Sequence, residues 1–221
     1  MNKLLEGLGE FRSVVFPRYE FRFRELATGQ NPEAMLITCA DSRIDPALMM
    51  QSDPGDVFVC RTAGNIVPPY EEGGGVVATV EYAVEVLRIR HIIVCGHSDC
   101  GAMKAALHPE KADGLPAVRR WLRHVECARR VALEDSDANA DERVNTITEE
   151  NVLAQLDHLL TYPCVAAAEK RGGLNLYGWV YDIPTGELKM FDPAEGVFAT
   201  FDGTLPVLAR RRVWKRTDRA A

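Results

Sequence analysis

The sequence predicts one α/β domain with a mostly parallel central sheet, flanking helices, an antiparallel hairpin at one sheet edge and an N-terminal helical arm. Two observations carry this prediction. Short apolar runs alternate with helical patterns through the first half of the chain, and a segment of alternating polarity that contains a turn follows near the end. A chain of 221 residues suits one domain. We divide it into an arm (1–30), a body and a basic tail (209–221).

The arm comes first along the chain. Residues 3–16 place apolar side chains at helical spacing, and the Phe16-Pro17 pair interrupts that pattern. Because this helix precedes every predicted strand, we expect its apolar face to cover a neighbouring subunit. Three short runs follow that are typical of parallel strands buried on both faces, namely AMLITC (34–39), DVFVC (56–60) and HIIVC (91–95).

Helical patterns at 75–89 and 102–108 alternate with these strands, which implies right-handed crossovers. Two longer helices are predicted at roughly 116–132 and 141–160, the second stopping before Pro163. The segment 174–192 contains the turn IPTGE and predicts a hairpin that completes the sheet. We interpret the basic tail as a solvated chain terminus.

Composition excludes several classes of protein. The formal net charge is −6, whereas a general nucleic-acid binder needs a basic surface. The N-terminus does not resemble a secretory signal, and no apolar stretch approaches the ~20 residues of a membrane span, so we expect a cytoplasmic protein without membrane or nucleic-acid partners. Six cysteines are too few for a disulfide scaffold. Cys60 and Cys95 are expected in the core, and Cys127 and Cys164 are expected to have no chemical role.

The stretch CGHSDCG follows an apolar strand and precedes a helical pattern. His97 and Cys100 are separated by two residues on this turn, so both side chains can reach one ion, and we expect Gly96 and Gly101 to allow a tight backbone there. Cys39 ends the first predicted strand, and the carboxyl ends of neighbouring parallel strands form the ligand crevice of an open α/β sheet. Two thiolates and one imidazole around Zn²⁺ leave a fourth position for water, as in catalytic zinc sites.

Three other local patterns have weaker interpretations. The run from Gly96 to Cys100 approaches the hydrolase elbow G-x-S-x-G, but cysteine replaces the last glycine. His124 and Cys127 repeat the H-x-x-C spacing on a predicted helix, with no glycine turn and no third ligand nearby. We therefore expect both to be residues of the helix surface that bind no metal. The G-x-G-x-x-A match at 73–78 follows VPPYEE instead of a strand, which argues against a nucleotide site.

Asp41 and Arg43 follow Cys39 in the stretch CADSRIDP, and in extended or turn geometry all three side chains can point to one side. A carboxylate beside zinc can accept a hydrogen bond from a zinc-bound water, or it can ligate the metal and close the site. A bidentate arginine partner favours the first outcome, because it holds the carboxylate back and keeps it ionised.

CADSRIDP and EYAVEVLRIRHIIVCGHSDCG closely resemble the two signature stretches of the β-class carbonic anhydrases, and the order of the rest is similar along nearly the whole chain. The resemblance implies one Zn²⁺ per chain on Cys39, His97 and Cys100, with a catalytic dyad of Asp41 and Arg43. It also implies a homodimer or homotetramer whose substrate pocket is shared between two subunits and formed by Gln30, Phe58, Ala63, Gly64 and Tyr82.

The activity implied by this resemblance is the reversible hydration of carbon dioxide to bicarbonate and a proton, for which zinc acidifies a bound water. Two alternatives stay open. One is the hydrolysis of carbonyl sulfide or carbon disulfide on the same scaffold, and the other is a zinc-stabilised assembly protein without turnover. A location in a bacterial microcompartment such as the carboxysome is the alternative to a dispersed cytoplasmic enzyme.

One departure from the family pattern concerns regulation. Leu36 stands where members with a noncatalytic bicarbonate site have tryptophan, although Arg61 and Tyr181 match the other two groups of that site. Leucine cannot donate a hydrogen bond, so bicarbonate would bind there weakly. We therefore expect an open zinc site at neutral pH, with Asp41 paired to Arg43.

Overall fold

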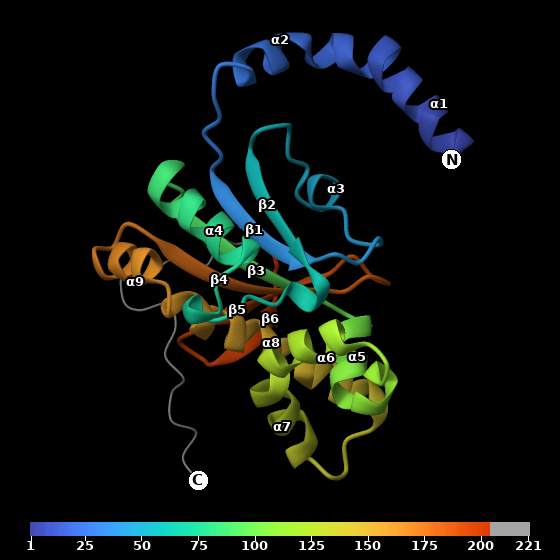
Figure 1. Cartoon of the computed structure of the whole chain (residues 1–221), viewed down its shortest axis with the longest axis vertical. Coiled ribbons are helices and arrows are strands. Elements are labelled where there is room, and N and C mark those ends of the chain that lie inside the picture. The colour runs from blue at the N-terminus through green and yellow to red at the C-terminus, as the bar shows by residue number, and fades with distance from the viewer. Residues whose placement is uncertain (204–221) are drawn as a thin grey trace.

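The computed structural model describes residues 1–203, in which helices pack around a central sheet and a helical arm extends from the body at the N-terminus (Figure 1). The basic tail expected over residues 209–221 lies outside the described residues. Among the described helices, none is long and apolar enough to cross a membrane.

Within residues 1–203, six strands form one sheet in the order β2-β1-β3-β4-β5-β6. Strands β2, β1, β3 and β4 run parallel, whereas β5 and β6 are antiparallel to their neighbours. The predicted sheet is confirmed, and its antiparallel edge has one strand more than the hairpin we expected. The strands are β1 (Ala34–Cys39), β2 (Val57–Thr62), β3 (His91–His97), β4 (Asn175–Tyr181), β5 (Leu188–Asp192) and β6 (Val197–Thr200).

Burial explains why the central strands have unbroken apolar sequences. Strands β1 and β3 lie inside the sheet, and every residue after the first in each strand is buried. Strand β2 has a similar composition but forms an edge of the sheet, where Val59 is exposed. An apolar edge strand with exposed side chains is a suitable surface for contact with another protein chain.

Helices cover both faces of the sheet (Figure 1). The largest core cluster joins the sheet to α4, α8 and α9, and a smaller cluster on the other face includes Met49 and Met50 of α3. A further cluster contains Cys39 and Cys100 and joins them to residues of α5, α7 and α8. The helices are α1 (Asn2–Glu10), α2 (Phe16–Leu26), α3 (Pro46–Met50), α4 (Gly75–Glu81), α5 (Gly101–Leu107), α6 (Pro116–Leu122), α7 (Glu126–Glu134), α8 (Ala140–Leu160) and α9 (Pro163–Lys170).

Two predicted helices differ from the structure in an informative way. The helix expected over 116–132 is divided, because a 3₁₀ turn over Arg123–Val125 separates α6 from α7. The turn lets α7 pack closely on α8 while burying Ala128 and Ala132. Helix α8 matches its prediction and begins at a capping box formed by Asn139 and Glu142.

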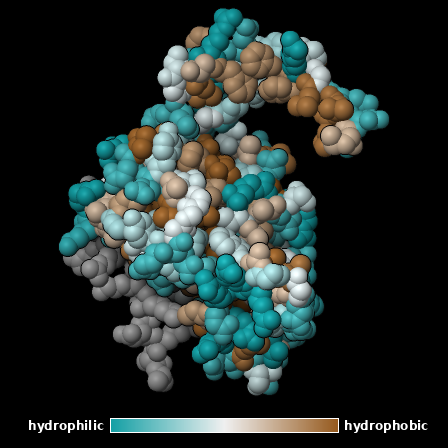
Figure 2. Space-filling model, viewed as in Figure 1, coloured by the Kyte–Doolittle hydropathy of each residue, from teal (hydrophilic) through white to brown (hydrophobic). Residues whose placement is uncertain are grey.

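The arm continues past Pro17, contrary to the interruption that we expected. A π turn over Phe11–Val15 joins α1 to α2, and Pro17 stands in the first turn of α2. The widened turn tolerates proline because its backbone already departs from the regular α-helical hydrogen bonds. None of the residues in α1 or α2 is buried, and Figure 2 shows apolar side chains along the arm. The exposed large apolar residues of the arm include Leu4, Leu5, Leu8, Phe11, Val14 and Phe21.

Candidate metal centre

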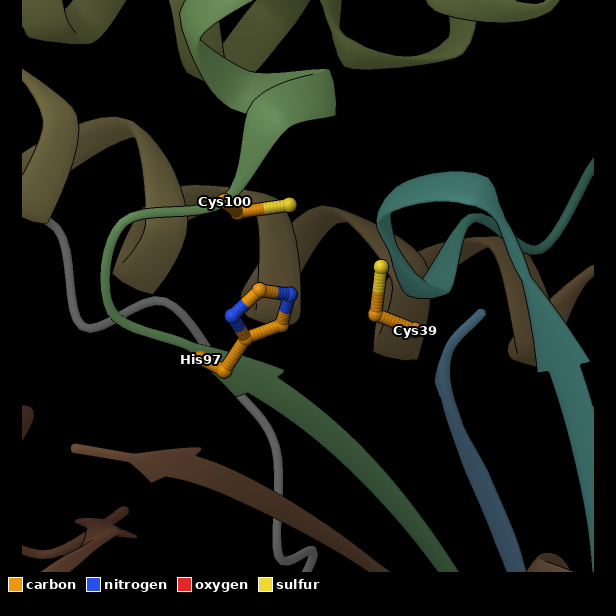
Figure 3. A group of neighbouring side chains, drawn as sticks. All are labelled: Cys39, His97 and Cys100. Carbon is orange, nitrogen blue, oxygen red and sulfur yellow. The ribbon is translucent and has the colours of Figure 1, made fainter. Parts of the chain in front are cut away.

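Three side chains gather at the carboxyl ends of two adjacent parallel strands. Cys39 is the last residue of β1, His97 is the last residue of β3, and Cys100 directly precedes α5. Figure 3 shows the two sulfur atoms and the imidazole ring directed toward one another. Their ligand atoms all lie within 4.8 Å of one another, and all three residues are buried.

Local backbone geometry places His97 and Cys100 side by side. Between them, Asp99 adopts the left-handed conformation with φ of 58°, which reverses the chain before α5. The N–H of Ser98 donates to the carbonyl of Tyr181 at 2.9 Å, and the Ser98 hydroxyl accepts the N–H of Ile183 at 2.9 Å. The turn is therefore tied to the end of β4.

The two glycines of this stretch have different roles, which corrects our expectation that both allow a tight backbone. A Cβ on Gly96 would lie 3.0 Å from a methyl of Val152 and 3.2 Å from one of Thr148, so this glycine permits the close approach of α8 to β3. A Cβ on Gly101 would meet nothing within 4 Å, and its φ is not in the left-handed region. Gly101 is not sterically required.

The imidazole of His97 is prepared to act as a ligand. Its Nδ1 lies 2.8 Å from the Ser98 carbonyl and must donate, because a carbonyl oxygen only accepts. The Nε2 atom therefore carries the free lone pair, and it is buried with no hydrogen-bond partner among the described residues. Buried polar atoms rarely lack a partner, and metal-bound histidines commonly donate their other nitrogen to a carbonyl. A cation is the partner that this geometry fits.

A hydrogen bond joins the side chains of Cys39 and Cys100, so ionisation of one opposes ionisation of the other. The hydrogen bond from Cys100, and then the Gly64 N–H, hold the pKa of the Cys39 thiol well below its usual range despite its burial. The neighbouring Cys39 thiolate and burial raise the pKa of Cys100 above its usual range. Both sulfurs could ionise side by side only with a cation between them, and a set of two sulfurs and one nitrogen is a ligand set that zinc prefers.

Asp41 and Arg43 form the pair that the sequence suggested. The guanidinium binds the carboxylate through two contacts, Nε to Oδ1 at 3.0 Å and Nη2 to Oδ2 at 2.8 Å. The pKa of Asp41 is held well below its usual range by the Arg43 side chain and then by the Arg43 backbone N–H. The free side of the carboxylate faces the metal ligands, since Oδ2 lies 3.8 Å from His97 Nε2.

Sequence reasoning missed the residue that holds Arg43 from its other side. Asp99 accepts a hydrogen bond from Arg43 Nη1 at 2.8 Å, and Lys104 also contacts its carboxylate. The position of Asp99 between two predicted ligands was the available signal. A charged chain from Asp41 to Lys104 thus follows the rim of the site.

The expected substrate pocket is only partly assembled within one chain. The Gly64 N–H contacts the sulfur of Cys39, and Ala63 precedes Gly64 in the same turn. The rings of Phe58 and Tyr82 pack against each other, with their centroids 6.2 Å apart. Phe58 pairs with Met35, four residues before Cys39, which places it about 13 Å along the strand at 3.3 Å per residue. Gln30 is exposed in the segment between α2 and β1.

The second H-x-x-C pair does not form a metal site. Cys127 is exposed, and the His124 ring packs edge-on against Trp121 and His158. In the part of the chain that the structure describes, the group of three or more close His, Cys, Asp or Glu ligands is Cys39, His97 and Cys100.

Comparison with known proteins decides the family. The sequence profile of the carbonic anhydrase family matches residues 34–188. The chain belongs to the carbonic anhydrase family. A carbonic anhydrase from Pseudomonas aeruginosa is 46% identical over 201 residues, covering 90% of this chain and 91% of that protein.

Solved structures of carbonic anhydrases share the fold. The β-carbonic anhydrase CcaA superposes with a TM-score of 0.88 at 43% identity, over 90% of this chain and 91% of that chain. Tetrameric β-carbonic anhydrases from Sordaria macrospora are also similar, with a TM-score of 0.76 at 32% identity over 90% of this chain and 100% of the other. These matches confirm the fold class and the family resemblance seen in the sequence.

Proposed function

We propose that this chain catalyses the reversible hydration of carbon dioxide at one zinc ion held by Cys39, His97 and Cys100. The observation that carries the proposal is the buried cluster of three ligand atoms within 4.8 Å, in which His97 Nε2 has no hydrogen-bond partner among residues 1–203. The carbonic anhydrase family and its named relatives support hydration of carbon dioxide over the hydrolysis of carbonyl sulfide or carbon disulfide.

The zinc ion, when bound, supplies the acidity that makes water a nucleophile near neutral pH. The chain itself orients the reactants. Asp41, fixed by Arg43 and ionised, can accept a hydrogen bond from the attacking water. This bond aligns the lone pair of the water toward carbon dioxide. Because Arg43 donates hydrogen bonds to both carboxylate oxygens of Asp41, it keeps Asp41 from acting as a fourth ligand.

The test combines carbon dioxide hydration in a stopped-flow instrument with zinc analysis of the same sample. We expect one zinc per chain, loss of hydration on removing zinc and recovery when zinc is returned. Zinc-loaded, folded protein that does not hydrate carbon dioxide would contradict the proposal. Competition by carbonyl sulfide or carbon disulfide would show whether the same site also hydrolyses them.

Self-association completes the pocket in this proposal. Phe58 lies near the start of β2, away from the ligands of its own chain, and Tyr82 packs against it, so both can serve the site of a second copy. The arm supports this assembly because apolar side chains such as Leu4, Leu8 and Phe21 are exposed in the described part of the chain. The similarity to tetrameric relatives also supports it. Deleting residues 1–16 should reduce the mass measured by light scattering, and an active monomer of the full chain would contradict shared pockets.

We further propose that bicarbonate does not close this site. Arg61 donates through Nε to the Cys39 carbonyl at 3.0 Å, and through Nη2 to the carbonyls of Asp41 and Ile44 at 2.6 and 2.8 Å. These bonds engage Arg61 in holding the loop after β1, and Leu36 offers no hydrogen-bond donor. Added bicarbonate at neutral pH should inhibit only as a product does, and a steep cooperative loss of activity would contradict this.

A further inference from the structure

The short turn Ala63–Asn65 after β2 reaches the metal centre through its backbone. The N–H of Gly64 donates to the sulfur of Cys39 at 3.3 Å. Gly64 is buried with φ of 71°, and a Cβ there would lie 2.8 Å from the Cβ of Ala102 and 2.9 Å from the terminal methyl of Met103. The turn is therefore wedged between Cys39 and the first turn of α5, so a small displacement would alter the N–H to sulfur contact.

Two side chains from different helices hold consecutive carbonyls of this turn. Asn151 of α8 donates through Nδ2 to the Gly64 carbonyl at 3.0 Å. Trp121 of α6 donates through Nε1 to the Ala63 carbonyl at 2.9 Å. Because the Ala63 carbonyl and the Gly64 N–H belong to the same peptide unit, the Trp121 bond constrains the direction of the N–H that faces Cys39.

The orientation of the Asn151 amide is itself fixed by a buried row of hydrogen bonds. Gln155 donates through Nε2 to Asn151 Oδ1 at 2.9 Å and accepts the Val67 N–H through Oε1 at 2.8 Å. The Val67 N–H can only donate and the Gly64 carbonyl can only accept, so these two ends set the polarity of both amides. Asn151 and Gln155 are both fully buried, where an unpaired amide is costly.

We infer that Asn151 and Trp121 are positioning residues for the zinc ligand Cys39. By holding the carbonyls of Gly64 and Ala63, they keep the Gly64 N–H on the Cys39 sulfur. That bond draws charge from the thiolate and orients its lone pairs, and outer contacts of this kind tune how tightly a metal is held. The inference rests on the proposed zinc site and extends it to two residues outside the predicted set of ligands and pocket residues.

The experiment compares wild type with Asn151→Leu, Trp121→Phe and the control Thr148→Val. Thr148 is buried on α8, three residues before Asn151, and its hydroxyl donates only to the carbonyl of Val144 in its own helix. Two measurements are made on folded protein. One is the rate of zinc transfer to a chelating dye, and the other is the position of the sulfur-to-cobalt charge-transfer band after cobalt replaces zinc.

We expect Asn151→Leu to lose zinc about 10-fold faster or more and to shift the cobalt band. Trp121→Phe should change the rate of zinc loss and the cobalt band in the same direction but by less. Thr148→Val should match wild type in both measurements. If Asn151→Leu does not fold, Trp121→Phe decides, because Trp121 is only partly buried. Folded variants that bind zinc and cobalt as wild type does would overturn the inference. A wild type that binds neither metal would instead refute the proposed zinc site.

Discussion

The chain contains the pattern H-x-x-C twice, and only one copy joins a metal-ligand cluster. His97 and Cys100 flank a strand-to-helix turn, are buried and face Cys39. His124 and Cys127 stand at a helix junction, where the histidine packs between aromatic rings and the cysteine is exposed. The residue types and the spacing are the same, so the difference lies in the backbone that carries them.

Three features beyond spacing distinguish the pair that joins the ligand cluster. At the first pair, a left-handed residue reverses the chain, a backbone carbonyl fixes the histidine tautomer and a neighbouring parallel strand supplies a third ligand. At the second pair, the nearby groups are His158, Glu72 and Arg123, which do not form a three-ligand set with it. The two pairs therefore differ because the first lies where the ends of two adjacent parallel strands, β1 and β3, meet.

Removing ligands should produce the largest contrast between the two pairs. We expect Cys39→Ala or His97→Ala to abolish zinc binding and to lower hydration by more than the about 10–100-fold typical of outer contacts. Cys127→Ala should retain one zinc per chain and wild-type activity. Metal analysis beside stopped-flow rates checks this, and a full zinc complement in Cys39→Ala would refute the ligand assignment.

Adding a methyl group to the turn should give a smaller effect that separates its two glycines. Gly96→Ala places a Cβ against Val152 and Thr148 and should destabilise the fold by about 1–3 kcal/mol, as overpacking does. Gly101→Ala enters open space at the start of α5 and should be neutral or stabilise by about 0.4–1 kcal/mol. Urea unfolding measures both changes, and equal losses would contradict the packing argument.

The smallest expected effect is a pH dependence at the second pair. Burial, and then the nearby charges of His158 and Arg123, lower the pKa of His124 against the opposing effect of Glu72. The unfolded chain then binds a proton more readily, so this contribution to stability is lost as pH falls below about 6.5. His124→Gln should lose less stability than wild type between about pH 7.5 and 5.5. Equal losses in urea unfolding would contradict this sign.

Most of the sheet could be predicted from sequence because burial on both faces forces apolar runs. The prediction failed where local pattern and tertiary packing disagree. Pro17 suggests a break, but a π turn before it lets the arm continue. The 3₁₀ turn at Arg123–Val125 leaves the helical periodicity nearly intact, so only the packing of α7 on α8 reveals it.

The gathering of Cys39, His97 and Cys100 could also be predicted, because each stands at the end of a strand or beside it. The groups that support them could not. Trp121 and Asn151 lie 58 and 87 residues along the chain from the carbonyls that they hold, and no local spacing links them. Such contacts depend on the packing of α6 and α8 around the end of the sheet.

The most direct test is a crystal of the zinc-loaded protein grown near neutral pH, with anomalous diffraction recorded at the zinc edge. We expect one peak per chain among Cys39 Sγ, His97 Nε2 and Cys100 Sγ, with zinc to sulfur distances of about 2.3 Å. The Asp41 carboxylate should remain on Arg43. A peak between His124 and Cys127, or an Asp41 oxygen within about 2.2 Å of zinc, would contradict it.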